Sequence, residues 1–258
     1  MKYGIVIVPV VDLRKRGWFS SERASQALFG TPVQIHSSRL NYIRITLPEG
    51  YSGWVNQRHI VQVSHAKWNN YIDLPKERVR KSILKIRFGN KPVEPHRLFF
   101  GTEVAVSHKK NGAVFYHPQG LYLPIQDHAL IPRTMEPTAA AIVKTATRFV
   151  GVPYLWGGIT PCGFDCSGLV QAVYRMHGIE LPRDSKQQAK VGEKIERDKL
   201  EKGDLLFFKG HVAICGDEGT IVHATSSRGM TVIESLDKNH PNYRKDLDTG
   251  FLFGRRVL

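Results

Sequence analysis

Residues 164–170 of this 258-residue chain read FDCSGLV, and Cys166 at their centre begins an apolar stretch that reaches His177. Gly178 follows where helices commonly end, so the pattern predicts a helix from Cys166 to His177. A thiol reacts as the thiolate, and the partial positive charge of a helix N-terminus lowers its pKa. The stretch indicates a nucleophilic cysteine, and taken alone it fits a buried structural cysteine equally well.

Two histidines downstream change that balance. His211 opens the strand-like segment 211–215, and His223 lies in the next one, 220–224. A hairpin of the two segments would bring the rings together, so that one takes the thiol proton and the other orients it. For the other nine histidines we expect structural roles.

The surrounding sequence predicts an α+β domain. Thr138 is a suitable N-cap for an Ala-rich helix that reaches Val150, and residues 134–138 resemble a linker. Strand-like segments follow at 204–209 and 231–234, so helices precede an antiparallel sheet. We expect Gly163 and Gly168 to let backbone approach a substrate closely. The triplet Asp248-Thr249-Gly250 has no second copy, and we interpret it as a turn.

The first 135 or so residues predict small β-barrels. Short β-rich runs separated by turn residues are typical of such barrels. Asn111-Gly112 is a strong hairpin signal. The basic segment 76–87 predicts a helix or strand with a solvated face, or a surface for an acidic partner. The β-rich runs are 5–11, 32–36, 41–47, 53–55, 102–107, 113–117 and 121–124.

The charge is uneven along the chain. Of the net +14, residues 1–136 carry +11 and residues 137–258 carry +3. A basic front half favours an anionic partner such as a wall polymer or acidic peptide, or it is a solvated surface. No RNA- or DNA-binding motif accompanies the charge, so we expect no nucleic-acid partner.

The cysteines and the N-terminus favour the cytoplasm. Three cysteines are too few for a disulfide scaffold and suit a reducing compartment. The apolar run 4–11 is too short to span a bilayer, and the chain lacks signal-peptide features, so we expect no membrane partner. A secreted or periplasmic protein whose signal peptide has been removed is the alternative. Cys162 and Cys166 lack a second ligand pair at zinc-like spacing, so we expect no metal.

An ordered set of motifs resembles the NlpC-type cysteine peptidase family. The resemblance covers most of residues 138–258 and implies a papain-like domain that cleaves peptide bonds in murein stem peptides. It makes Cys166 the nucleophile, His211 the base and His223 the orienting residue, with Tyr154 near the oxyanion. The motifs are YLWGG (154–158), DCSGL (165–169), LPRDS (181–185), GDLLFF (203–208), HVAI (211–214) and His223-Ala224.

The front half resembles the bacterial SH3-like domains that precede such peptidase domains. The matching stretches are 10–14, 25–30 and 50–55. The resemblance implies an SH3-like barrel in residues 1–66, a second in 67–134 and the papain-like domain in 135–258. This arrangement is similar to the γ-D-glutamyl-L-diamino-acid endopeptidases.

That similarity implies a set of substrate-binding residues. Tyr51 matches the tyrosine by which the first barrel helps enclose the substrate's amino end. Asp165, Asp184 and Ser185 match residues that hold the free amine of an N-terminal L-alanine, and Ser167 is added to the substrate-binding set. A capping pair ahead of a helix is the alternative for Asp184 and Ser185.

The resulting expectation is a cytoplasmic endopeptidase of murein-peptide recycling. Its substrate would be L-Ala-γ-D-Glu-diamino acid, cut between glutamate and the diamino acid, with no metal or cofactor. One alternative is a secreted hydrolase of intact wall anchored by its basic barrels. The other is a non-catalytic wall-binding protein with a dead peptidase domain.

Overall fold

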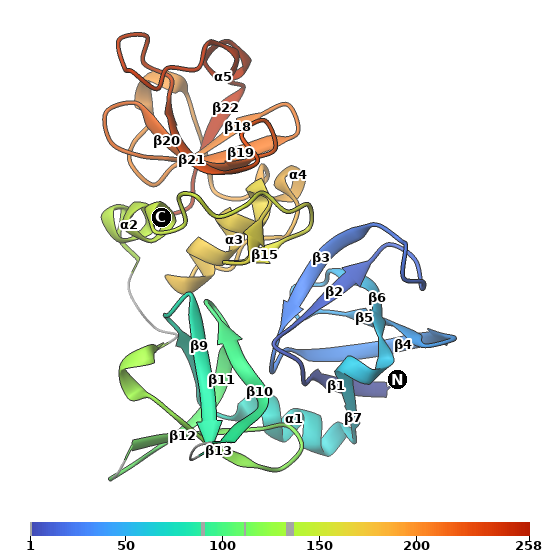
Figure 1. Ribbon diagram of the computed structural model, residues 1–258. Coiled ribbons are helices and arrows are strands. Elements are labelled where there is room, and N and C mark those ends of the chain that lie inside the picture. The colour runs from blue at the N-terminus through green and yellow to red at the C-terminus, as the bar shows by residue number, and fades with distance from the viewer. Residues whose placement is uncertain (1, 89–90, 111, 133–136) are drawn as a thin grey trace. The chain divides into compact units, whose positions relative to one another are not determined.

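The computed structural model describes residues 2–88, 91–110, 112–132 and 137–258. The chain divides into two compact units, Met1–Arg133 and Thr134–Leu258 (Figure 1). Among the described helices, none has both the length and the apolar character needed to cross a bilayer.

The first unit begins with a seven-stranded antiparallel sheet in the order β3-β2-β6-β5-β4-β1-β7. Side chains alternate along its strands, and the inward set forms one apolar core that includes Leu13, Ile45 and Val55. The run predicted at 5–11 is two strands, because Pro9 has no N–H to continue a ladder. The strands are β1 (Lys2–Val6), β2 (Val10–Arg14), β3 (Arg23–Leu28), β4 (Pro32–Arg39), β5 (Tyr42–Thr46), β6 (Ser52–Asn56) and β7 (Ile60–Val63), with a 3-10 turn at Gln57–His59.

Helix α1 (His65–Asp73) leads to a five-stranded sheet, β13-β12-β11-β8-β14, and a separate hairpin, β9-β10. The basic segment 76–87 is therefore strand, turn and strand rather than a helix. The predicted hairpin joins β11 and β12, although Asn111 itself lies outside the described residues. The strands are β8 (Lys76–Val79), β9 (Ile83–Phe88), β10 (Lys91–Phe99), β11 (Glu103–Lys109), β12 (Gly112–Tyr116), β13 (Tyr122–Ile125) and β14 (Leu130–Pro132), with a 3-10 turn at Asp127–Ala129.

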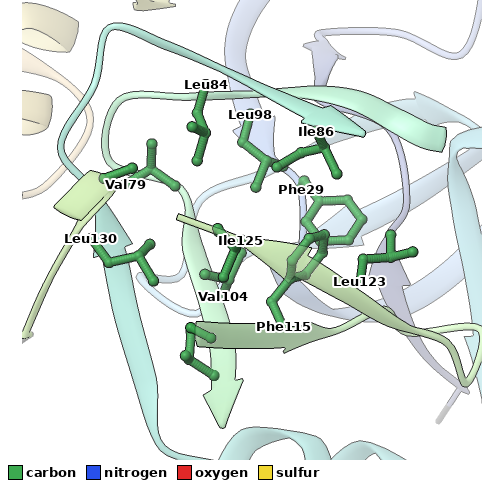
Figure 2. Packing of buried hydrophobic residues seen from close by; sticks show 13 residues of the cluster. Phe29, Val79, Leu84, Ile86, Leu98, Val104, Phe115, Leu123, Ile125 and Leu130 are labelled. Atoms are coloured by element: carbon green, nitrogen blue, oxygen red, sulfur yellow. The ribbon is translucent and has the colours of Figure 1, made fainter. Parts of the chain in front are cut away.

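One residue of the first sheet region belongs to the core of the second. Phe29 follows β3 and packs edge-on against Phe115 of β12, with ring centroids 5.9 Å apart (Figure 2). The same cluster of buried side chains includes Val79, Ile86 and Leu98, which come from β8, β9 and β10. The two sheet systems therefore share packed side chains, and the division at residue 66 stays a prediction.

The second unit has helices first and then an antiparallel sheet, in the order β17-β22-β18-β19-β20-β21. Helices α2 and α3 pack against β19 and β20 (Figure 1). The α+β order is confirmed, Thr138 caps α2, and the predicted turn at Asp248 is the end of a short helix, α5. The elements are α2 (Ala139–Thr147), β15 (Ile159–Thr160), β16 (Gly163–Phe164), α3 (Cys166–Met176), α4 (Ser185–Gln188), β17 (Glu193–Ile195), β18 (Leu205–Phe208), β19 (His211–Cys215), β20 (Thr220–Thr225), β21 (Met230–Ser235), α5 (Lys245–Gly250) and β22 (Phe253–Arg256), with a 3-10 turn at Arg197–Lys199.

Glycines hold the loop before β15 against the first turn of α3. A Cβ on Gly168 would lie 2.1 Å from the carbonyl oxygen of Gly158, and one on Gly163 would lie 2.5 Å from Leu155 Cβ. These glycines therefore allow close packing within the domain. Their expected role in close approach of the backbone to a substrate stays a prediction. The contact fixes residues 154–158 beside the N-terminus of α3.

We predict that Gly168→Ala destabilises the protein although it places alanine in a helix. The clash with the Gly158 carbonyl should cost about 1–3 kcal/mol of unfolding free energy. Gly250→Ala in α5 is the matched control, because a Cβ there meets no atom within 4 Å. Thermal or urea unfolding of both variants measures this, and equal stability of the two would contradict the packing role.

Candidate active site

Cys166 is the first residue of α3, as the sequence predicts. Asp165 is the N-cap, and its Oδ1 accepts a hydrogen bond from the Gly168 N–H at 2.7 Å. Cys166 as a whole is partly exposed, and the backbone groups of Ser167 and of Val212 on β19 lie near enough to its thiol to lower the thiol pKa. The proximity of Val212 places the sulfur beside the strand that His211 opens.

His211 and His223 form the pair that the sequence predicts. Their rings are joined by a 2.8 Å hydrogen bond between His211 Nε2 and His223 Nδ1. On the far side, His223 Nε2 lies 3.0 Å from Oε2 of Glu234. Because Nε2 of His211 faces His223, its Nδ1 remains to receive a proton from a thiol.

Burial shifts both reacting groups toward their neutral forms. Burial, and then the Asp165 carboxylate, raises the pKa of the Cys166 thiol to about 11, although the Val212 and Ser167 hydrogen bonds and Arg183 oppose the shift. Burial and His223 lower the pKa of His211 to about 3, with Glu234 opposing them. The helix N-terminus by itself predicted a lowered thiol pKa, but desolvation of the sulfur outweighs it. Both shifts favour a neutral thiol and a neutral imidazole before any substrate binds.

A buried ion pair holds the first turn of α3. Arg183 Nη2 lies 2.6 Å from Asp165 Oδ2, and the two side chains are 1% and 9% exposed. The same guanidinium donates to the Ser167 hydroxyl at 2.9 Å, and the Gly157 N–H donates to Asp165 at 2.9 Å. Asp165 and Ser167 are thus engaged within the protein, and their substrate-binding roles stay predictions.

The other predicted site residues differ in their surroundings. Asp184 occupies the N-cap position of α4, as the capping alternative predicts, but its exposed side chain makes no capping hydrogen bond. Ser185 is the first residue of α4 and partly exposed. Burial raises the pKa of Tyr154 to about 12, and the nearby Cys166 and Asp165 add to the shift. Tyr51 lies in the first unit, packed against its core, and its role stays a prediction.

Within the described part of the chain, no three or more His, Cys, Asp or Glu side chains cluster in an arrangement for a metal ion. All three cysteines are free thiols, with Cys162 exposed and Cys215 buried.

Comparisons with known proteins agree with this geometry. Residues 151–247 match the NlpC/P60 family, and residues 13–60 match the bacterial dipeptidyl-peptidase Sh3 domain. The γ-D-glutamyl-L-lysine dipeptidyl-peptidase of Bacillus subtilis is 30% identical over 246 residues, which cover 86% of this chain and 78% of that protein. This chain belongs to the NlpC/P60 family. It is a cysteine peptidase with a papain-like fold and an N-terminal SH3 domain.

Further similarities extend over nearly the whole peptidase. Dipeptidyl-peptidase 6 of Lysinibacillus sphaericus is 28% identical, with 95% of this chain and 96% of that one covered. The crystal structure of an NlpC/P60 family protein from Bacillus cereus superposes with a TM-score of 0.83 at 22% identity, covering 99% of both chains. The second similarity concerns the fold alone.

Sequence reasoning missed Glu234 and the role of Arg183. Glu234 ends a segment predicted as a strand, but its face depends on the register of β20 and β21, which the turn at 226–229 sets. Ile221 pairs with Glu234 and His223 with Val232, so alternation places His223 and Glu234 on one face. Arg183 lies within a recognised motif, and nothing in the local pattern names its partner.

The raised thiol pKa predicts how Cys166 reacts in the absence of substrate. Below its pKa, a thiol gains about tenfold in thiolate fraction per pH unit. The rate of iodoacetamide alkylation of Cys166 should therefore rise at least about tenfold between about pH 7 and pH 9. Peptide mass spectrometry measures it, with exposed Cys162 as internal reference. A rate for Cys166 that is flat over this range would indicate a preformed thiolate–imidazolium pair instead.

Proposed function

We propose that this peptidase hydrolyses the bond between γ-D-glutamate and the diamino acid in murein stem peptides that begin with a free L-alanine. The relatives that support this are named for γ-D-glutamyl-L-lysine dipeptidyl-peptidase activity. Removal of a dipeptide requires a site that recognises the amino end of the substrate. The amine is a cation, so its recognition in a protein site calls for a carboxylate.

The observation that carries the proposal is the state of Asp184. Its carboxylate is exposed and, among the described residues, has no hydrogen-bond or ion-pair partner. The residue before it is Arg183, whose ion pair with Asp165 ties this segment to the start of α3. Asp165 already has a cation, whereas Asp184 has a charge to offer to a substrate ammonium. Ser185 adds a hydroxyl beside it.

The site's own groups account for the chemistry. His211 Nδ1 takes the Cys166 proton as the sulfur attacks the γ-carbonyl carbon of glutamate. The phenol of Tyr154 and free N–H groups at the start of α3 stabilise the oxyanion. Collapse breaks the C–N bond, with the proton passing from His211 to the leaving amine. Water activated by His211 then hydrolyses the thioester and restores the thiol.

The proposal places this reaction in the cytoplasm, on peptides already released from the wall. The three free thiols suit a reducing compartment. We propose that the first unit holds two SH3-like barrels and that Tyr51 of the first is a substrate-binding residue. A site that requires a free amino end would exclude stem peptides that are still attached to glycan. The basic charge of this half would serve an anionic wall fragment.

Cys166→Ala tests the nucleophile. We expect kcat on L-Ala-γ-D-Glu-diaminopimelate to fall at least about 10³-fold, because the acyl-enzyme cannot form. Cys162→Ala, which removes an exposed thiol four residues away, should leave kcat within about twofold. Chromatographic rates with purified proteins measure both. Residual activity of Cys166→Ala within tenfold of the parent would contradict the assignment.

Asp184→Ala tests amine recognition. For the free-amine tripeptide we expect kcat/KM to fall about 10²-fold, since the substrate's ammonium loses its carboxylate. For the N-acetylated tripeptide, which has no ammonium, the change should stay within about threefold. Asp217→Ala, which removes an exposed carboxylate from the β19–β20 loop, is the control variant. Equal losses on both substrates would remove Asp184 from the amine site.

A further inference from the structure

Glu234 is a buried carboxylate at the end of the histidine chain. It lies on β21, only 3% exposed, and its Oε2 is 3.0 Å from His223 Nε2. The other oxygen, Oε1, accepts from Arg228 Nε at 2.8 Å and from Arg244 Nη1 at 2.6 Å. Both oxygens of the Glu234 side chain therefore have hydrogen-bond partners, and one of these partners is the ring of His223.

An ionised carboxylate accepts hydrogen bonds and cannot donate them. The bond to Glu234 therefore requires the proton of neutral His223 to be on Nε2, which leaves Nδ1 as an acceptor. His223 Nδ1 is 2.8 Å from His211 Nε2, so His211 in turn must donate from Nε2. The neutral His211 ring then carries its free lone pair on Nδ1, the nitrogen that must take the thiol proton.

His223 alone does not fix these proton positions. With no fixed acceptor behind it, His223 can carry its proton on Nδ1 and donate to His211 Nε2. His211 would then hold its proton on Nδ1 and could not act as a base toward Cys166. Between two neutral imidazoles, either ring can be the donor of the hydrogen bond. The carboxylate of Glu234 determines which ring donates.

We propose that Glu234 is a positioning residue that fixes the tautomers of His223 and His211 and so makes His211 Nδ1 the base. The inference rests on the proposed roles of Cys166 and His211. Glu234 acts through His223 and does not contact the reacting atoms.

The surroundings keep Glu234 in the acceptor-only form. Burial alone would raise its pKa, but hydrogen bonds from His223, Arg228 and Arg244 outweigh burial and lower the pKa to about 2. Arg244 also pairs with Asp246 at 2.7 Å, so it is held between two carboxylates. When His211 becomes an imidazolium, the charge of Glu234 stabilises it across His223.

The direct test is nitrogen-15 NMR of the imidazole rings in full-length protein carrying Cys166→Ala, which needs no substrate. We expect both His211 and His223 to be neutral with the proton on Nε2. Adding Glu234→Gln, whose amide can accept or donate, should give a mixture of tautomers at both rings. Adding Arg228→Gln, which removes a partner but keeps the carboxylate, should leave them unchanged. Single, unchanged tautomers in Glu234→Gln would overturn the proposal.

Kinetics of enzymes with Cys166 intact give a second readout. Glu234→Gln should lower kcat about 10- to 100-fold with KM within about threefold, and slow alkylation of Cys166 by a similar factor. Glu234→Asp keeps an acceptor-only group and should recover most of the loss. If Glu234→Gln fails to fold, Glu234→Asp with a mixed tautomer at His223 overturns the proposal. If the tautomers are fixed as expected but no murein peptide is cut, the proposed function fails and the role of Glu234 remains.

Discussion

The buried ion pair between Asp165 and Arg183 is the constraint on which the active site depends. Asp165 caps α3, receives the Gly157 N–H of the tyrosine loop and meets the guanidinium of Arg183. One carboxylate thus joins the helix that starts at Cys166, the loop with Tyr154 and the segment that precedes Asp184. Removing one partner of such a pair leaves an uncompensated buried charge and costs about 3–5 kcal/mol. The pair also sets the local field, since Asp165 raises the pKa of the thiol while Arg183 opposes it.

A second series of hydrogen-bonded side chains lies on the sheet. It runs through the rings of His211 and His223 to the carboxylate of Glu234, across neighbouring strands β19, β20 and β21. Asp165 directly precedes Cys166 at the start of α3, and His211 directly precedes Val212, whose backbone lies near the thiol. Burial favours the neutral thiol of Cys166 and the neutral imidazole of His211, so in the proposed mechanism charge develops during attack, when the oriented groups can stabilise it. The proposed mechanism therefore depends on accurate positions of the reacting groups rather than on a permanently charged thiolate. The glycine contacts that hold residues 154–158 against α3 contribute to this positioning.

Much of this domain could be predicted from the sequence, and the features that could not be predicted depend on tertiary contacts. Cys166 at a helix start and His211 and His223 on adjacent strands follow from short-range patterns, and the structure places them so. Glu234 required the register of a hairpin, and Arg183 required a tertiary partner, which periodicity does not contain. A lowered thiol pKa was predicted from the helix terminus together with a nearby histidine, whereas desolvation depends on packing around the sulfur. In the front half, strands were found but their sharing of a core through Phe29 was not, because that contact joins residues far apart in sequence.

We propose that the peptidase cuts peptides already released from the wall and recognises their free amino end. Mass spectrometry of the products from L-Ala-γ-D-Glu-diaminopimelate and from intact sacculi, incubated with equal enzyme, tests it most directly. The account predicts L-Ala-D-Glu and free diaminopimelate from the tripeptide, and sacculi left intact. Cleaved sacculi together with an untouched tripeptide would contradict it and would make this protein a hydrolase of the intact wall.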